Sequence, residues 1–117
     1  MITDVDNNQI STGYNGIPRG VLDLRERLER PAKYLFTSHA EENAIAQAAR
    51  VGAMTKGCTA YVTHCPCARC ARMLIQAGIV RAVYDIKGTT SMPEEEFIAA
   101  KIMLIEAGIE LVCVNAQ

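Results

Sequence analysis

The chain contains no tryptophan and only six other aromatic residues, four tyrosines and two phenylalanines. Neither sign of charge predominates, because 12 lysines and arginines face 13 aspartates and glutamates and leave a formal net charge of −1. A chain without a positive excess lacks the broad electrostatic surface that binds duplex nucleic acid or anionic lipid. We therefore expect neither nucleic acid nor membrane as a partner, although a few local basic residues can still hold a small anionic ligand.

Long apolar runs and a disulfide framework are missing as well. No uninterrupted apolar stretch reaches the length of about 18 residues that a membrane-spanning helix needs. The first six residues have neither the basic nor the apolar region of a secretory signal. The five cysteines are an odd number, and three of them crowd together at positions 65, 67 and 70, which suits a metal site better than disulfides. These features predict a protein of the reducing cytoplasm.

The order of the predicted elements indicates the fold class. No repeat, low-complexity tract or linker divides the 117 residues, so we expect one domain over residues 1–117. Strands are predicted at 2–5, 9–12, 58–63, 79–84 and 109–114, and helices at 39–51, 66–77 and 94–107. This alternation predicts an α/β fold of three layers, with a mixed sheet of about five strands, the last two parallel, and helices on both faces. The last two strands are apolar throughout, as is typical of strands buried on both faces.

Two motifs carry the chemistry. His39-Ala40-Glu41 lies at a predicted helix start, where Ser38 and Glu41 have the spacing of a capping box. Pro66-Cys67-Ala68-Arg69-Cys70 opens the next helix. Two cysteines three residues apart point the same way from a helix start, where backbone N–H groups favour thiolates. With His39 they offer zinc three ligands and leave one position open for water, which is the pattern of a catalytic site.

Glu41 follows His39 by two residues and can reach such a water without being a ligand. Zinc lowers the pKa of its water to about 7, and an adjacent carboxylate can carry the released proton to the substrate. Each element alone has an ordinary interpretation: a structural or redox Cys-x-x-Cys, a capping glutamate, a hydrogen-bonded histidine. Their joint order, H-x-E followed by P-C-x-x-C, is the signature of zinc-dependent nucleobase deaminases and favours catalysis.

From Ile10 to about Tyr84 the chain resembles the cytidine deaminase superfamily, and within it the deoxycytidylate (dCMP) deaminase branch. Residues 11–20, STGYNGIPRG, look like that branch's GYNG-type loop, and residues 30–34 leading into HAEENAI look like its catalytic helix. The matching positions imply zinc ligands at His39, Cys67 and Cys70, a general acid and base at Glu41 and a sugar contact at Asn15. Tyr14 and Gly16 are further nucleotide-binding candidates by the same resemblance.

The resemblance also implies partners and cofactors. Relatives form dimers to hexamers, and association would stabilise so small a domain with few aromatic residues. The GYNG loop is associated in the family with allosteric dCTP, which would bring Mg²⁺. Some relatives hold a second, structural zinc with extra cysteines and histidines before the catalytic helix, but residues 17–38 contain neither, so we expect one Zn²⁺ per chain.

The substrate pocket is less defined by the sequence. This chain reaches the GYNG loop within thirteen residues, whereas family members generally begin with a helix and a complete strand, so we expect part of the usual phosphate pocket to be missing or replaced. Among Arg19, Arg25, Arg27 and Lys33, we select Arg19 for the phosphate. The pocket candidates beside the motifs are Ala40, His64, Cys65 and Pro66. His64 and Cys65 stand where relatives commonly have bulkier apolar residues near the base. We therefore expect the pocket to have room for a 5-methyl or 5-hydroxymethyl group on the cytosine.

We therefore expect an enzyme, a hydrolase that deaminates dCMP, or its 5-methyl or 5-hydroxymethyl form, to the corresponding dUMP and ammonia. One alternative is a deaminase of the same fold that acts on a nucleoside, a free base or a tRNA adenosine, of which the near-neutral charge disfavours the last. The other is a catalytically silent zinc or nucleotide-binding domain.

Overall fold

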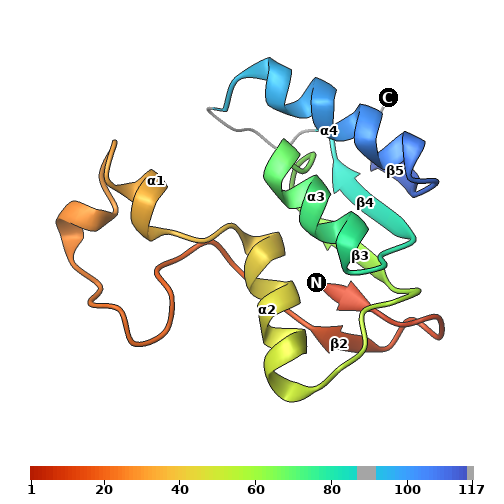
Figure 1. Cartoon of the computed structure of the whole chain (residues 1–117), viewed down its shortest axis with the longest axis horizontal. Helices are drawn as coiled ribbons and strands as arrows, with labels where there is room; N and C mark the ends of the chain where they lie inside the picture. Colours follow the sequence, from red (N-terminus) through yellow and green to blue (C-terminus); the bar gives the residue numbers. More distant parts are fainter. Residues whose placement is uncertain (87–91, 116–117) are drawn as a thin grey trace.

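The computed structural model of the chain describes residues 1–86 and 92–115, and its centre is a five-stranded sheet (Figure 1). The strands are β1 (Ile2–Thr3), β2 (Gln9–Ser11), β3 (Thr59–Val62), β4 (Arg81–Asp85) and β5 (Glu110–Val114), in the order β2-β1-β3-β4-β5. β1 pairs antiparallel with β2 and β3, whereas β3, β4 and β5 run parallel. The predicted mixed sheet and the parallel pairing of its last two strands are confirmed.

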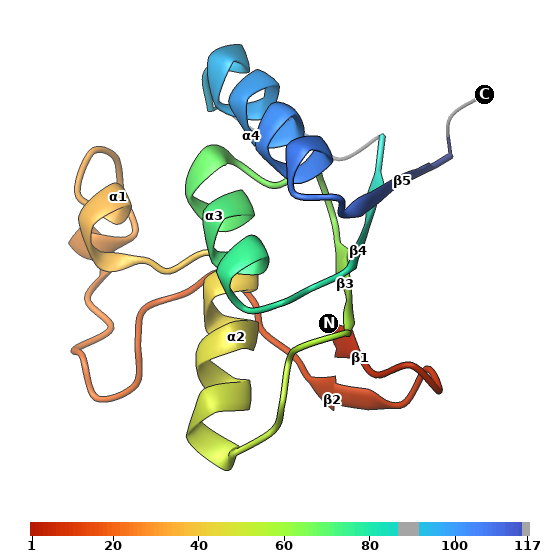
Figure 2. The ribbon, with the colours of Figure 1, turned by 45° about the vertical axis from the view of Figure 1, so that its right-hand side comes forward.

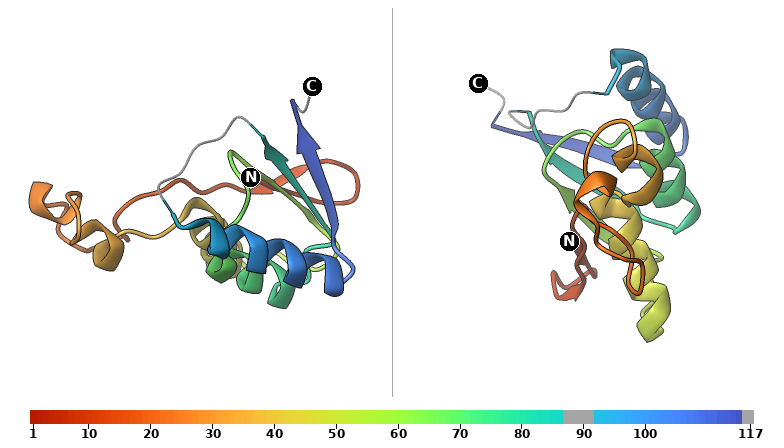
Figure 3. Two further views of the ribbon diagram at one scale, coloured as in Figure 1. Left: turned by 90° about the horizontal axis from the view of Figure 1, so that it is seen from above. Right: turned by 90° about the vertical axis from the view of Figure 1, so that its left-hand side faces the viewer.

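Three helices pack on the sheet: α2 (Ala40–Val51), α3 (Ala68–Gln76) and α4 (Glu94–Glu106). All three lie on the same face, as Figures 2 and 3 show. The topology explains this arrangement, because β3, β4 and β5 advance in one direction across the sheet and right-handed crossovers then place α3 and α4 on one side. The helix layer expected on the second face is not among the described elements. Accordingly β5 is a half-exposed edge strand and is not buried on both faces.

Alanines bring the helices close to the sheet. Ala60, Ala82 and Leu111 lie side by side in register on β3, β4 and β5 and face the helices. Ala71 of α3 and Ala100 of α4 are fully buried in the cluster that contains Ala82. Because these side chains are small, α3 sits close to both the sheet and α4. The helix that carries the cysteine motif is therefore the central and best packed helix of the layer.

The N-terminal hairpin is locked onto α2 at Gly13. A Cβ atom at this glycine would lie 2.5 Å from the carbonyl oxygen of Ala40 and 2.5 Å from the nitrogen of Ala44, so only glycine fits. Nearby, the Ser11 hydroxyl donates a hydrogen bond of 2.6 Å to the Ala44 carbonyl. The close approach sets the following loop, which contains the GYNG motif, against the first turn of α2.

Residues 17–37 form an arm that projects from the body (Figures 1 and 3). Gly16 and Ser38 close its base, since each backbone N–H donates to the carbonyl of the other, at 3.2 and 2.8 Å. The arm contains a 3-10 turn, η1 (Arg25–Arg27), and a helix that was not predicted, α1 (Lys33–Phe36). Within the residues that the structure describes, no helix has the length and apolar composition required to cross a bilayer.

The start of α2 differs from the prediction by one residue. His39, and not Ser38, is the N-cap, and the capping glutamate is Glu42, whose carboxylate accepts a hydrogen bond of 2.9 Å from the His39 N–H. Ser38 lies one residue before the helix, where its backbone is paired with that of Gly16. The prediction of a Ser38 and Glu41 capping box was therefore wrong, and Glu41 is released from that structural task.

Candidate active site

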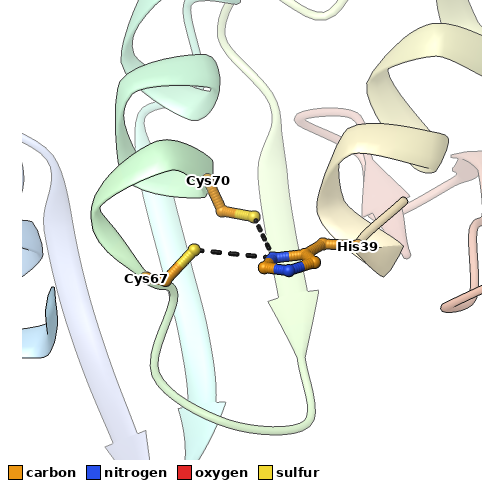
Figure 4. A group of neighbouring side chains, drawn as sticks. All are labelled: His39, Cys67 and Cys70. Atoms are coloured by element: carbon orange, nitrogen blue, oxygen red, sulfur yellow. Dashed lines mark hydrogen bonds between the residues drawn. The ribbon is translucent and has the colours of Figure 1, made fainter. Parts of the chain in front are cut away.

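His39, Cys67 and Cys70 converge at the facing ends of α2 and α3 (Figure 4). The Nδ1 atom of His39 lies 3.2 Å from the Cys70 sulfur and 3.5 Å from the Cys67 sulfur. His39 and Cys67 are the N-cap residues of their helices, and Cys70 lies one turn into α3. This is the group of potential metal ligands found among the described residues, and its three ligand atoms all lie within 4.8 Å of one another.

The three donors fit a zinc ion. Tetrahedral zinc with a Zn–N distance of about 2.0 Å and a Zn–S distance of about 2.3 Å separates nitrogen from sulfur by about 3.5 Å. The two observed separations lie close to this value before any rearrangement. Two sulfurs and one imidazole are ligands that zinc prefers, and three protein ligands leave the fourth position for water or substrate.

The Cys67 and Cys70 thiols differ in pKa, and the shared proton stays on Cys70. A hydrogen bond donated by Cys70 to the Cys67 sulfur, helped by the Cys70 backbone N–H and by His39, lowers the pKa of Cys67 to about 5. Because Cys70 is the donor of that bond and is buried, its pKa is raised above the ordinary thiol value. One thiolate is thus present at neutral pH without metal, and a bound ion has to displace the proton of Cys70.

Glu41 lies beside this group, and no described residue forms a hydrogen bond or salt bridge with its carboxylate. It follows Ala40 in the first turn of α2, its side chain is only 7% exposed, and it borders the same cavity as His39 and Cys67. The cavity has a volume of about 490 Å³ and lies between the metal-ligand group, the arm and the first turn of α4. A carboxylate in this position can exchange protons with a molecule bound at the open ligand position.

The GYNG loop supplies one wall of the cavity. Asn15 and Gly16 line it, and the Asn15 side-chain oxygen accepts a hydrogen bond of 2.7 Å from the Ala40 N–H. Tyr14 points out to solvent, although its carbonyl accepts a hydrogen bond of 2.7 Å from the Asn43 side chain. The structure thus brings Asn15 and Gly16 to the metal-ligand group and leaves the Tyr14 ring outside.

Of the other predicted pocket residues, two line a cavity and two do not. His64 lines the main cavity, with its Nδ1 atom 3.0 Å from the Cys65 carbonyl oxygen. Ala40 borders a smaller neighbouring cavity of about 110 Å³. Pro66 is fully buried and Cys65 is not part of either wall. Burial raises the pKa of the Cys65 thiol, which disfavours the thiolate that a metal ligand requires.

Arg19, the residue selected for the phosphate, lies elsewhere. Its guanidinium donates to the side-chain oxygen of Gln47, about two turns along α2 from His39, and it does not line the cavity. The cations that do line the cavity are Lys33 from the arm and Arg69 and Arg72 from α3. From the sequence, Arg69 and Arg72 could equally lie at a subunit contact. Glu96 of α4, which also borders the cavity, was not singled out because it belongs to no local motif.

Comparison with known proteins agrees with this geometry. The zinc-binding region that characterises cytidine and deoxycytidylate deaminases matches residues 1–86. The chain belongs to this family. The match includes the GYNG loop and all three metal-ligand candidates.

Individual relatives of the deaminase family match nearly the whole chain. An uncharacterised deaminase of Aliivibrio fischeri is 42% identical over 90% of this chain and 71% of its own length. The deoxycytidylate deaminase of Mus musculus is 35% identical over 92% of this chain and 62% of its own length. The chain thus spans between about three fifths and about seven tenths of these two relatives.

A solved structure confirms the deaminase fold. The dCMP deaminase of the cyanophage S-TIM5, in complex with dCMP and dUMP, superimposes with a TM-score of 0.72 over 97% of this chain and 78% of its own length, at 24% sequence identity. The predicted cytidine-deaminase-like architecture is therefore confirmed.

Proposed function

We propose that this deaminase converts dCMP and water to dUMP and ammonia. The observation that carries the proposal is the buried Glu41 carboxylate, which borders the same cavity as His39 and Cys67 and forms no hydrogen bond or salt bridge with a described residue. The mouse relative is a deoxycytidylate deaminase, and the cyanophage enzyme was crystallised with dCMP and dUMP. Both support a deoxycytidine nucleotide as the substrate.

In this proposal His39, Cys67 and Cys70 hold one zinc ion per chain. When bound, zinc acidifies water to a pKa of about 7 and so supplies a nucleophile at neutral pH. Glu41 accepts the proton of the attacking water and delivers it to N3 of cytosine. It then takes the second proton from the new hydroxyl group on C4 and delivers it to the departing amine, so that C4 becomes a carbonyl and ammonia leaves. Glu41 is thus the only proton carrier that the reaction needs.

We assign the 5′-phosphate to Lys33 and Arg72, in place of Arg19. Both cations line the cavity, and no carboxylate of the described residues lies within ion-pair distance of either. Arg69 is less available because it is paired with Glu42 at 2.9 Å. A phosphate dianion would therefore find two cations whose charge no described carboxylate offsets at short range. Asn15, at the same wall, is assigned to the sugar.

We further propose that the chain associates with itself. Ile98, Ile102 and Ile105 of α4 are exposed and form an apolar stripe on the outer side of the helix. Ala100 and Leu104, on the inner side of α4, are buried against the sheet. A helix that is apolar on both sides is normally covered on both sides. The cytoplasmic location, the binding of dCTP with Mg²⁺ and the acceptance of 5-substituted cytosines stay predictions.

The test is ammonia release from a panel of amines by protein of known zinc content. The panel contains dCMP, 5-methyl-dCMP, 5-hydroxymethyl-dCMP, deoxycytidine, cytosine and a tRNA adenosine substrate. We expect turnover of dCMP, with deoxycytidine at least tenfold poorer in kcat/KM. Turnover restricted to a nucleoside, a base or tRNA would replace the proposed substrate, and zinc-loaded protein without any turnover would identify a silent binding domain.

A further inference from the structure

One carboxylate oxygen joins the two helices that carry the metal ligands. The Glu42 Oε1 atom accepts a hydrogen bond of 2.9 Å from the backbone N–H of His39 and another of 2.9 Å from the Arg69 guanidinium. Glu42 belongs to α2, whereas Arg69 belongs to α3 and lies between Cys67 and Cys70 in the chain. The His39 backbone is thus connected to the turn that contains both cysteines by two hydrogen bonds to one atom.

The opposite flank of the same turn is held by α4. The Glu96 side chain accepts a hydrogen bond of 3.2 Å from the backbone N–H of Ala68, the first residue of α3. The Cys67–Cys70 turn therefore has a polar support on each side, one from α2 through Arg69 and one from α4 through Ala68. The contact through Arg69 and Glu42 also reaches His39, whereas the contact through Ala68 and Glu96 does not.

The Arg69 guanidinium holds the Glu42 carboxylate in place. The same carboxylate oxygen accepts from the His39 backbone N–H, at the end of α2 that carries the first candidate ligand. Arg69 is the cation paired with Glu42, and its guanidinium offsets the carboxylate charge at a salt-bridge distance of 2.9 Å. Removal of the guanidinium would leave Glu42 free to turn away and to release the N-terminal end of α2.

We propose that Arg69, acting through Glu42, is a positioning residue that fixes the distance between His39 and the Cys67–Cys70 pair and thereby slows the loss of the metal. This inference rests on the zinc site of the proposed function but not on the identity of the substrate. Residues that orient metal ligands typically contribute about 10- to 100-fold to metal affinity. Because the Arg69 side chain is 48% exposed and solvent screens the pair, we expect a smaller contribution than this, about three- to tenfold.

The experiment measures the rate at which zinc-loaded protein loses its metal to an excess of a chromogenic chelator, in the absence of substrate. Four variants are compared with the parent: Arg69→Met, Arg69→Lys, Glu42→Gln and Arg81→Met. The last is the matched control, because Arg81 is also an arginine paired with a glutamate, Glu110 at 4.0 Å, and is 40% exposed, but it lies on β4. Glu42→Gln keeps an oxygen for the His39 N–H and removes the charge that holds Arg69.

We expect Arg69→Met and Glu42→Gln to lose zinc about three- to tenfold faster, Arg69→Lys to recover most of the difference and Arg81→Met to behave like the parent. A fifth protein that combines Arg69→Met with Glu42→Gln should lose zinc no faster than the quicker of these two single variants, because both changes break the same link. Equal rates for Arg69→Met and Arg81→Met would overturn the inference. A parent protein that holds zinc but does not deaminate dCMP would refute the proposed substrate and leave this result standing.

Discussion

The Asn15 side-chain oxygen accepts a hydrogen bond of 2.7 Å from the backbone N–H of Ala40, and this bond fixes which way the amide group faces. With the oxygen occupied, the NH₂ group is left to donate to a ligand in the cavity that Asn15 lines. The loop that carries Asn15 is in turn held by the Asn43 side chain through the Tyr14 carbonyl. The first turn of α2 thus orients a donor as well as a metal ligand.

Replacement of Asn15 by Asp should raise KM for dCMP at least tenfold. The carboxylate can still accept from the Ala40 N–H, but it has no hydrogen to donate and repels a phosphate-bearing substrate. Steady-state kinetics of Asn15→Asp beside Tyr14→Phe tests this, because the Tyr14 ring points to solvent. Similar KM values for the two variants would refute the role of Asn15.

Replacement of Glu41 by Gln should lower kcat by about 10²- to 10⁴-fold and leave one zinc ion per chain. The amide cannot carry protons, whereas the three ligands are untouched. Turnover and metal content should be measured on one preparation, with the first-turn residue Glu95 of α4 replaced by Gln as control. A loss smaller than tenfold would show that another group moves the proton.

Lys33→Met and Arg72→Met should each raise KM for dCMP by about tenfold while the much weaker turnover of deoxycytidine stays constant. A charge that contacts only the phosphate cannot affect a substrate that lacks one. Arg19→Met is the control, because Arg19 contacts Gln47 outside the cavity. If Arg19→Met shows the selective loss instead, the phosphate binds at Arg19, as the sequence analysis expected, and not at Lys33 and Arg72.

Zinc binding at pH 8 should release about two protons per chain, one from Cys70 and one from the metal-bound water, whose pKa is about 7. The pKa of Cys67 is lowered to about 5, so this thiol is already ionised, whereas Cys70, with its raised pKa, must lose its proton to the solvent. Affinity should therefore rise by about a hundredfold per pH unit near pH 8. Calorimetric titration in buffers of different ionisation enthalpy counts the protons, and a value near three would mean that the thiols ionise independently of each other.

Cys67→Ala and Cys70→Ala should each abolish stoichiometric zinc binding and lower Tm, whereas Cys113→Ala should retain the metal. Cys113 lies on the edge strand β5, away from the ligand group. Metal analysis and thermal unfolding with and without chelator separate the effects, because zinc that binds only the folded chain raises its stability. Retention of zinc by Cys70→Ala would exclude this thiol as a ligand.

The features that the sequence predicts well are those with a short repeat or a fixed spacing. Cys67 and Cys70 share a helix turn, His39 opens the preceding helix, and the strand pattern at 79–84 and 109–114 gives a parallel pair. The helix turn and the helix start depend on local geometry, and the parallel pair follows from the crossover through the intervening helix. The convergence of His39 with the cysteines across 28 residues follows from the family resemblance and not from spacing.

The features that the sequence misses depend on contacts distant in the chain. Ser38 and His39 both stand three residues before a glutamate, and the bridge from Ser38 to Gly16 decides between them. The Arg19 side chain points away from the cavity because its guanidinium donates to Gln47, which is 28 residues away in the chain. The single-faced helix layer depends on strand order, which no local pattern contains.

The bridge between Gly16 and Ser38 has a consequence for how this family can diversify. Because the two ends of the arm meet at this one point, residues 17–37 can change in length or composition without moving the chain that enters α2. Loop closure at a fixed base costs little more for a longer insert, about 0.6 kcal/mol per doubling of length. The mouth of the proposed catalytic cavity can therefore vary separately from the candidate metal ligands, and we expect arms grafted from other deaminases at these two residues to carry their substrate selectivity with them.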